Sequence, residues 1–200
     1  YVIAVMGAKG GLGVSTLAIN LGISLQNRAH QDVIVAEFRP GEGSSALDRG
    51  YVRPDSYEYL GMAWTQLGDP EKGLAAFLRA LEQEPSDILL LTIGQTYLQM
   101  KHTGEAVDYL LRALTTTEDK AIERQARFKL GEIFLDQGEV FKAEEQYLAL
   151  VELDPRSADA HFYLGEVYAR LNDAVKARAE WRAALALDNQ HYGARLRLFR

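Results

Sequence analysis

Between residues 54 and 191 the apolar positions recur at spacings of three and four, the pattern of helices that bury one face. Four glycines mark a longer period within it, because Gly61, Gly94, Gly131 and Gly165 stand 33, 37 and 34 residues apart. A large aliphatic residue precedes each glycine. An aromatic residue follows three positions later in every case: Trp64, Tyr97, Phe134 and Tyr168. A fixed period of this length predicts repeated structural units.

A second half of each unit follows with its own register. Twelve residues after each glycine stands a small residue, and four further on a bulky one: Phe77, Leu110, Tyr147 and Trp181. Turn residues such as Gly68-Asp69-Pro70 separate the halves, and Pro85 and Pro155 end two of the units. The pattern predicts four helical hairpins, at about 54–86, 87–123, 124–157 and 158–191. A single hairpin leaves an apolar face exposed, so neighbouring hairpins must stack.

Two segments depart from the regular register. Residues 115–120 lengthen the second unit by about one helical turn, which predicts a longer connection or an extended helix. Residues 192–200 repeat the beginning of a first helix and are expected to start a capping helix.

These correlated positions resemble the tetratricopeptide repeat. The resemblance implies a mainly α fold, an α-solenoid of four helical hairpins over residues 51–200. It also implies a protein–protein interaction scaffold or adaptor, in which the first helix of each pair lines a concave groove for a peptide or helix. The groove positions carried over are Glu58, Met62, Gln66, Leu91, Gln95, Leu98, Phe128, Glu132, Leu135, Phe162, Glu166 and Arg170.

The residues at these positions indicate what the groove would bind. Family members that grip a terminal carboxylate use lysine, asparagine and arginine there, and this chain has only Arg170. The groove is otherwise apolar with an acidic margin, which suits an apolar or mildly basic helix or extended segment. Periodicity leaves an alternative open, in which Leu91, Phe128 and Phe162 fill the core between helices.

Residues 1–50 carry a different pattern. The apolar run 2–6 predicts a buried strand, which is followed by a glycine-rich loop, a helix and a second strand at 33–38. This βαβ unit resembles the deviant P-loop of MinD/ParA-type ATPases, and the loop is most similar to their pilus-assembly members. The resemblance implies a weak or vestigial nucleotide site for ATP and Mg²⁺, made by Lys9, Gly10, Gly11, Gly13, Ser15 and Thr16.

Departures from that motif argue against ATP hydrolysis. Val14 replaces the lysine that would reach the terminal phosphates, and Arg39 replaces a carboxylate expected near the attacking water. Most strands of the ATPase fold are also missing, so the chain is not expected to be an enzyme or to require a cofactor. The alternative is a nucleotide-dependent MinD/ParA-type switch or ATPase that docks partners through the repeats, in pilus or secretion assembly.

Composition narrows the remaining classes of function. The chain has no cysteine, and its 4 histidines lack the paired spacing of a metal site, so no metal is expected. The net charge of −6 falls on residues 51–200 without a basic stripe, so nucleic acid is not an expected partner. No apolar stretch is long enough for membrane insertion. A cytoplasmic location is expected; the oligomeric state stays open, and the start at Tyr1 suggests a piece of a longer protein.

Overall fold

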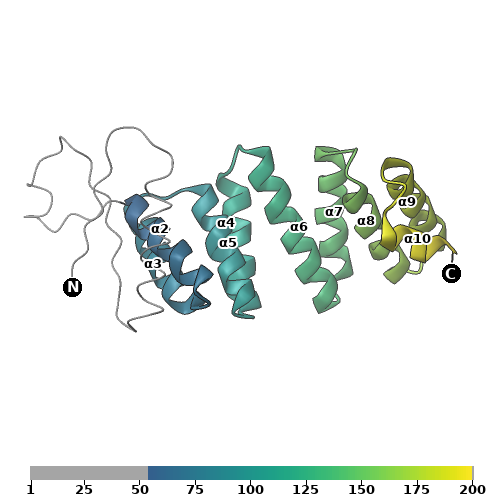
Figure 1. The fold of residues 1–200 in the computed structure, drawn as a ribbon. Helices are drawn as coiled ribbons and strands as arrows, with labels where there is room; N and C mark the ends of the chain where they lie inside the picture. Colours follow the sequence, from purple (N-terminus) through teal and green to yellow (C-terminus); the bar gives the residue numbers. More distant parts are fainter. Residues whose placement is uncertain (1–53, 200) are drawn as a thin grey trace, which may run out of the picture. The chain divides into compact units, whose positions relative to one another are not determined.

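A computed structural model describes residues 54–199, with side chains from residue 57 onward, and these residues form helices joined by short connections (Figure 1). The helices are α2 (Pro54–Gln66), α3 (Pro70–Gln83), α4 (Asp87–Gln99), α5 (Thr103–Thr116), α6 (Lys120–Gln137), α7 (Val140–Leu153), α8 (Ala158–Arg170), α9 (Ala174–Leu187) and α10 (Tyr192–Phe199). The mainly α fold is confirmed for this part of the chain. The predicted βαβ unit of residues 1–50 lies outside the described residues.

The described helices belong to two compact units, one ending at His102 and the other beginning at Thr103. In the first unit α2 packs on α3, and α3 packs on α4. In the second unit each helix from α5 to α10 packs on the next one along the chain. Contacts between successive helices are what stacked hairpins require, since each repeat is stabilised by its neighbours.

Local sequence signals set the ends of the helices. Pro70 occupies the first turn of α3, where the missing N–H costs no hydrogen bond, and Asp69 accepts a hydrogen bond from the backbone N–H of Lys72 at 3.1 Å. Ser157 caps α8 in the same way, at 3.2 Å from the N–H of Ala160. The C-terminal end of α6 is capped by Gly138, whose φ of 76° is left-handed and therefore suits glycine.

The extra residues at 115–120 lengthen a helix. Only residues 117–119 separate α5 from α6, and α6 has 18 residues where the other first helices have 13. The carboxylate of Asp119 accepts a hydrogen bond from the N–H of Ala121 at 2.7 Å and thereby caps the longer helix. The first helix of the third hairpin thus begins at Lys120, before the predicted hairpin boundary at 124.

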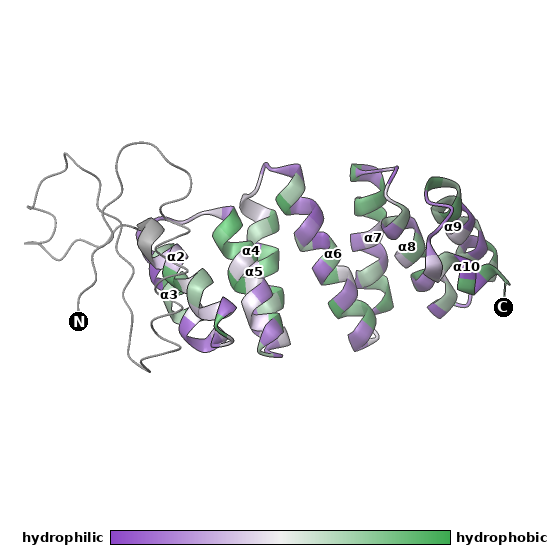
Figure 2. Ribbon diagram, in the orientation of Figure 1, coloured by the Kyte–Doolittle hydropathy of each residue, from purple (hydrophilic) through white to green (hydrophobic). Residues whose placement is uncertain are grey.

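Three of the repeated glycines, Gly61, Gly131 and Gly165, lie under aromatic rings. A Cβ atom on Gly131 would lie 2.6 Å from Cζ of Tyr147, and one on Gly165 would lie 2.5 Å from Cδ1 of Trp181. A Cβ atom on Gly61 would lie 2.5 Å from Cδ1 of Phe77. The glycine of the first helix therefore lets the ring of the second helix pack directly on the backbone. Figure 2 shows hydrophobic and hydrophilic residues together on helices such as α6 and α7, as helices buried on one face require.

Candidate functional site

In the first unit the predicted groove positions differ in exposure. The side chains of Met62 and Gln66 are exposed, with 50% of Met62 accessible to solvent, and Glu58, Gln95 and Leu98 are half-buried. Leu91 is only 1% exposed, so its assignment to a binding surface is wrong. The sequence could not show this, because residues on the core face and on the adjoining groove face of a helix recur with the same spacing.

In the second unit most of the predicted positions remain accessible. Phe128, Glu132, Phe162 and Glu166 are half-buried, and Arg170 is exposed. The side chain of Leu135 is 5% exposed, so this position too is corrected to the core. The structure therefore keeps the aromatic and charged positions of α6 and α8 as candidates for binding and removes the aliphatic one.

Four aromatic side chains meet between α6, α7 and α8. The ring of Tyr163 stacks on Tyr147 with centroids 5.4 Å apart and planes at 8°. Its edges meet Phe128 at 5.1 Å and Phe162 at 5.2 Å in T-shaped contacts. Tyr147 is fully buried, whereas the other three rings are half-buried. We call Phe128, Phe162 and Tyr163 the aromatic surface.

Tyr163 was not among the residues predicted from the sequence. Its signal is the aromatic pair Phe162-Tyr163, since the corresponding place in α6 holds Lys129 after Phe128. Sequence alone could not show that the second ring of the pair would lie over a tyrosine of the preceding unit.

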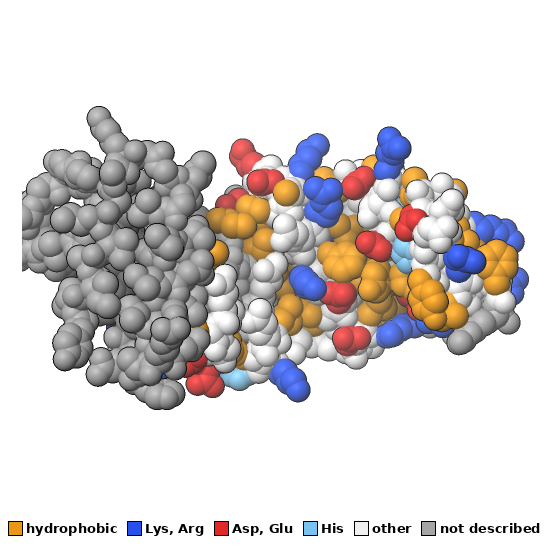
Figure 3. Space-filling model, viewed as in Figure 1, with side chains coloured by type: hydrophobic (Ala, Val, Ile, Leu, Met, Phe, Trp, Pro, Cys, Tyr) orange, Lys and Arg blue, Asp and Glu red, His pale blue; other side chains and the backbone are white. Residues whose placement is uncertain are grey.

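Charged side chains surround the aromatic surface, and several pair within the chain. Figure 3 shows hydrophobic side chains among acidic and basic ones over α6 and α8. The ammonium of Lys129 lies 2.9 Å from the carboxylate of Glu132. Arg197 of α10 donates two hydrogen bonds to Glu166, at 2.8 and 2.5 Å.

Arg170 has a structural partner. Its Nη1 donates a hydrogen bond to the backbone carbonyl of Leu135, near the C-terminal end of α6. A positive charge is favourable there because the helix dipole places partial negative charge at that end. The one arginine expected to face a ligand thus links α8 to α6.

The tyrosine hydroxyls lie in an environment that keeps them protonated. Burial raises the pKa of Tyr163, and the carboxylates of Glu132, Asp159, Glu166 and Asp136 raise it further. Burial also raises the pKa of Tyr147, with Glu132 as the largest carboxylate contribution, while Arg170 acts in the opposite direction. The hydroxyl of Tyr147 is buried without a hydrogen-bond partner. The neutral phenol of Tyr163, which is half-buried, can donate a hydrogen bond and pack against a ligand.

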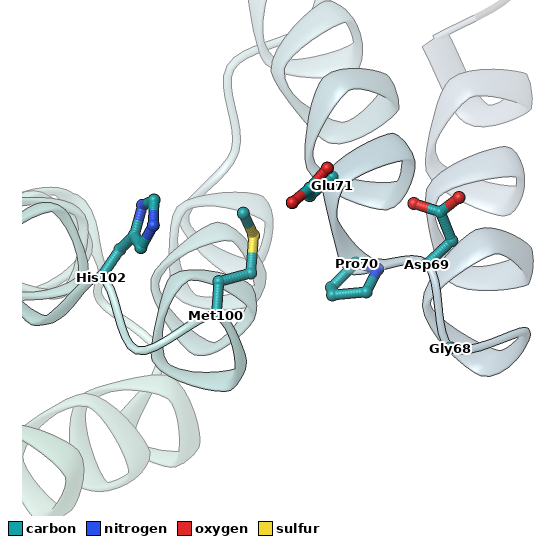
Figure 4. A pocket seen from close by; sticks show the side chains of 6 residues that line it. All are labelled: Gly68, Asp69, Pro70, Glu71, Met100 and His102. Carbon is teal, nitrogen blue, oxygen red and sulfur yellow. The ribbon is translucent and has the colours of Figure 1, made fainter.

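The first compact unit contains a cavity beside the loop before α3 (Figure 4). A pocket of about 350 Å³ is lined by Gly68, Asp69, Pro70, Glu71, Met100 and His102. Asp69 already caps α3 and pairs with Lys72 at 3.3 Å. The sequence did not predict this pocket, because it forms where the loop before α3 meets the end of α4. We regard the aromatic surface as the stronger candidate.

The predicted nucleotide site, Lys9, Gly10, Gly11, Gly13, Ser15 and Thr16, lies outside the described residues. Within residues 54–199 no group of three or more histidine, aspartate or glutamate side chains could hold a metal ion. No described helix is long and apolar enough to cross a membrane.

Comparison with known proteins places the repeats in a family. The sequence model described as "Tetratricopeptide repeat" matches residues 44–88, 91–151 and 129–192, which together exceed half of the chain. No curated protein matches the sequence.

Solved structures with the same fold have low sequence identity. A tetratricopeptide repeat protein from Parabacteroides merdae has a TM-score of 0.65 and 20% identity over 72% of this chain, which spans 56% of that protein. YrrB, described as a TPR protein with an unusual peptide-binding site, has a TM-score of 0.68 and 20% identity, covering 94% of this chain and 88% of its own. MamA has a TM-score of 0.64 and 17% identity, with coverages of 89% and 91%. These neighbours show that the fold of the described residues is that of stacked tetratricopeptide repeats.

Proposed function

We propose that this chain, which belongs to the tetratricopeptide repeat family, binds a peptide or helix of another protein. The aromatic surface of α6 and α8 is the observation that carries the proposal. The buried ring of Tyr147 contacts Phe128 and Tyr163, Phe162 packs on Tyr163, and all three rings of the surface remain partly accessible. Rigid aromatic side chains supply large contact areas at low conformational cost, which is why they often dominate binding energy.

The contacts around the rings favour a ligand with apolar side chains. Tyr163 touches three other rings, so it is positioned before any ligand arrives. Preorganised contacts lose less conformational entropy on binding. An apolar side chain that covers Phe128 and Tyr163 would complete the burial of rings that are only half-buried in the free chain.

The charges argue against recognition of a terminal carboxylate. Arg170 already donates to the carbonyl of Leu135, and Arg197 is held by two hydrogen bonds to Glu166. A ligand carboxylate at α8 would compete with both interactions and lie near Glu166. An internal segment of a partner is therefore the better ligand.

The proposal is tested with the full 200-residue chain as bait for a random-sequence peptide display library. Synthetic copies of enriched peptides are measured by fluorescence anisotropy against the wild type and two variants. Phe128→Glu places a charge within the aromatic surface, and we expect it to weaken binding at least about tenfold. Phe141→Glu makes the same exchange at a side chain of α7 that is 76% exposed, and it should leave binding unchanged.

Folding must be separated from binding in this comparison. Phe128 contacts Tyr147 at 6.1 Å between ring centroids, so circular dichroism must show that Phe128→Glu keeps its helix content. Phe128→Ala, which introduces no charge, serves as a second variant and should also weaken binding. The proposal fails if all enriched peptides bind folded Phe128 variants as tightly as the wild type.

A further inference from the structure

We propose that the segment bound at α6 and α8 is anchored by a basic side chain, arginine or lysine, held by the carboxylates of Glu132 and Asp136. This inference rests on the proposed function and specifies the chemistry of the partner. It follows from a comparison of two steps of the repeat, where a step is the pairing of the first helix of one hairpin with the first helix of the next. The first step pairs α8 with α10, and the second pairs α6 with α8.

At the first step the chain supplies a basic partner itself. The guanidinium of Arg197 in α10 donates two hydrogen bonds to the carboxylate of Glu166 in α8. Beside it the imidazole of His191 lies on Phe162, with ring centroids 4.8 Å apart, and its Nε2 is 3.1 Å from Asp159. The carboxylate of Glu166 thus receives a guanidinium from α10, and the ring of Phe162 is contacted by the imidazole of the residue just before α10.

At the second step the aromatic ring and the carboxylate recur, but the basic side chain beside them, Lys129, comes from the same helix and not from the next first helix. Phe128 and Glu132 of α6 stand 34 residues before Phe162 and Glu166 and occupy the same repeat positions. At the position of Arg197, however, α8 has Tyr163, which is again 34 residues earlier. Glu132 therefore receives no guanidinium from the next helix.

The present partner of Glu132 is weak. Lys129 belongs to the same helix, three residues earlier, and the two side chains are 40% and 34% exposed. Exposed ion pairs of this kind contribute little, because solvent screens both charges and two long side chains must be ordered. A basic group of a ligand could share or replace Lys129 at little cost.

Asp136 adds a second carboxylate one turn further along α6. It is exposed, and within the described residues it makes no hydrogen bond or ion pair. Arg170 supplies the opposing positive charge, but its Nη1 is directed to the carbonyl of Leu135.

The acidic groups around the aromatic surface also favour a basic ligand. Four carboxylates, Glu132, Asp159, Glu166 and Asp136, raise the pKa of the Tyr163 hydroxyl after burial has done so. A cation over or beside these rings is attracted both by the carboxylates and by the faces of the rings, and arginine is suited to both contacts.

The test uses peptides enriched from the random-sequence display library on the full chain. We expect them to carry arginine or lysine at a fixed distance from a bulky apolar residue. One such peptide is synthesised with its arginine or lysine and with methionine in that place. Both are titrated into the wild type and into the double variant Glu132→Gln, Asp136→Asn.

A double-mutant cycle separates the ion pair from general effects. On the wild type the methionine peptide should bind about three- to tenfold more weakly, and on the double variant the two peptides should bind nearly equally. The control variant Glu145→Gln, Glu152→Gln removes the same charge from exposed positions of α7 and should keep the full difference.

The outcomes distinguish this inference from the proposed function. Peptides that depend on Phe128 but show no basic preference, or no coupling to Glu132 and Asp136, overturn the basic anchor and leave the binding function intact. If no enriched peptide depends on Phe128, both are wrong. A difference that persists unchanged in the double variant also refutes the anchor, because the basic group would then act elsewhere.

Discussion

Replacing Gly131 by alanine tests the packing on which the aromatic surface rests. The new Cβ would lie 2.6 Å from Cζ, 2.8 Å from Cε2 and 3.0 Å from Cε1 of Tyr147. The ring of Tyr147 cannot move away from the new methyl group. It is fully buried, and it stacks on Tyr163 of the aromatic surface with ring centroids 5.4 Å apart. The methyl group must therefore displace the ring or separate α6 from α7.

Two effects of opposite sign set the magnitude. Overpacking of a buried site costs about 1–3 kcal/mol, and this contact lies in the upper part of that range because ring atoms cannot yield. Alanine in a helix interior gains about 1 kcal/mol over glycine. The net expectation is that Gly131→Ala lowers the free energy of unfolding by about 1–2 kcal/mol.

Gly104→Ala is the matched control within the same unit. Gly104 lies in α5, and a Cβ there would meet no atom within 4 Å. This variant should gain about 0.5–1 kcal/mol from backbone effects alone. Urea unfolding followed by circular dichroism compares both variants with the wild type.

Equal stabilisation by both alanines would contradict this expectation, because it would show that the Tyr147 ring does not lie on Gly131. As a further check, the cost of Gly131→Ala should largely disappear in a Tyr147→Leu background, because the smaller side chain leaves space for the methyl group.

Three further changes probe individual interactions. A hydrogen bond from the backbone N–H of Lys72 holds the pKa of Asp69 below its ordinary 3.8, so its cap stabilises α3 above that pH and is lost as the pH falls through the lowered pKa. Asp69→Ala should cost about 1 kcal/mol near neutral pH and Asp69→Asn much less, and urea titrations should show the stability of the wild type approaching that of Asp69→Asn in acid. Tyr147→Phe should leave the free energy of unfolding unchanged or raise it by up to about 1 kcal/mol, because the buried hydroxyl has no hydrogen-bond partner. A clear loss of stability would reveal an acceptor. Arg197→Ala removes a partly exposed pair with Glu166 and should cost about 0.5–1 kcal/mol. Hydrogen exchange should then quicken in α10 while α7 is unaffected.

The sequence predicted the fold well where a residue pattern was compatible with only one local structure. The glycine at 131 and the bulky residue at 147 recur in register, and in three of the four repeats, at Gly61, Gly131 and Gly165, the structure shows an aromatic ring packed on the glycine. The segment 115–120 was compatible with a longer loop or a longer helix. The cap at Asp119 decides for the helix.

The candidate site was predictable only in part. Leu91 and Leu135 share the spacing of exposed groove positions, yet both are buried, because periodicity does not separate adjoining faces of one helix. Tyr163 was missed because its partners, Tyr147 and Phe128, lie on other helices. The engagement of Arg170 by the carbonyl of Leu135 likewise depends on two units being stacked.

The proposed binding places a partner segment on α6 and α8. Hydrogen exchange of the full chain, measured by mass spectrometry with and without a library-selected peptide, locates that segment. We expect slower exchange in α6 and α8 on peptide binding, with little change in α7 and α9. Protection confined to α7 and α9, or to residues before α6, would contradict the proposed binding.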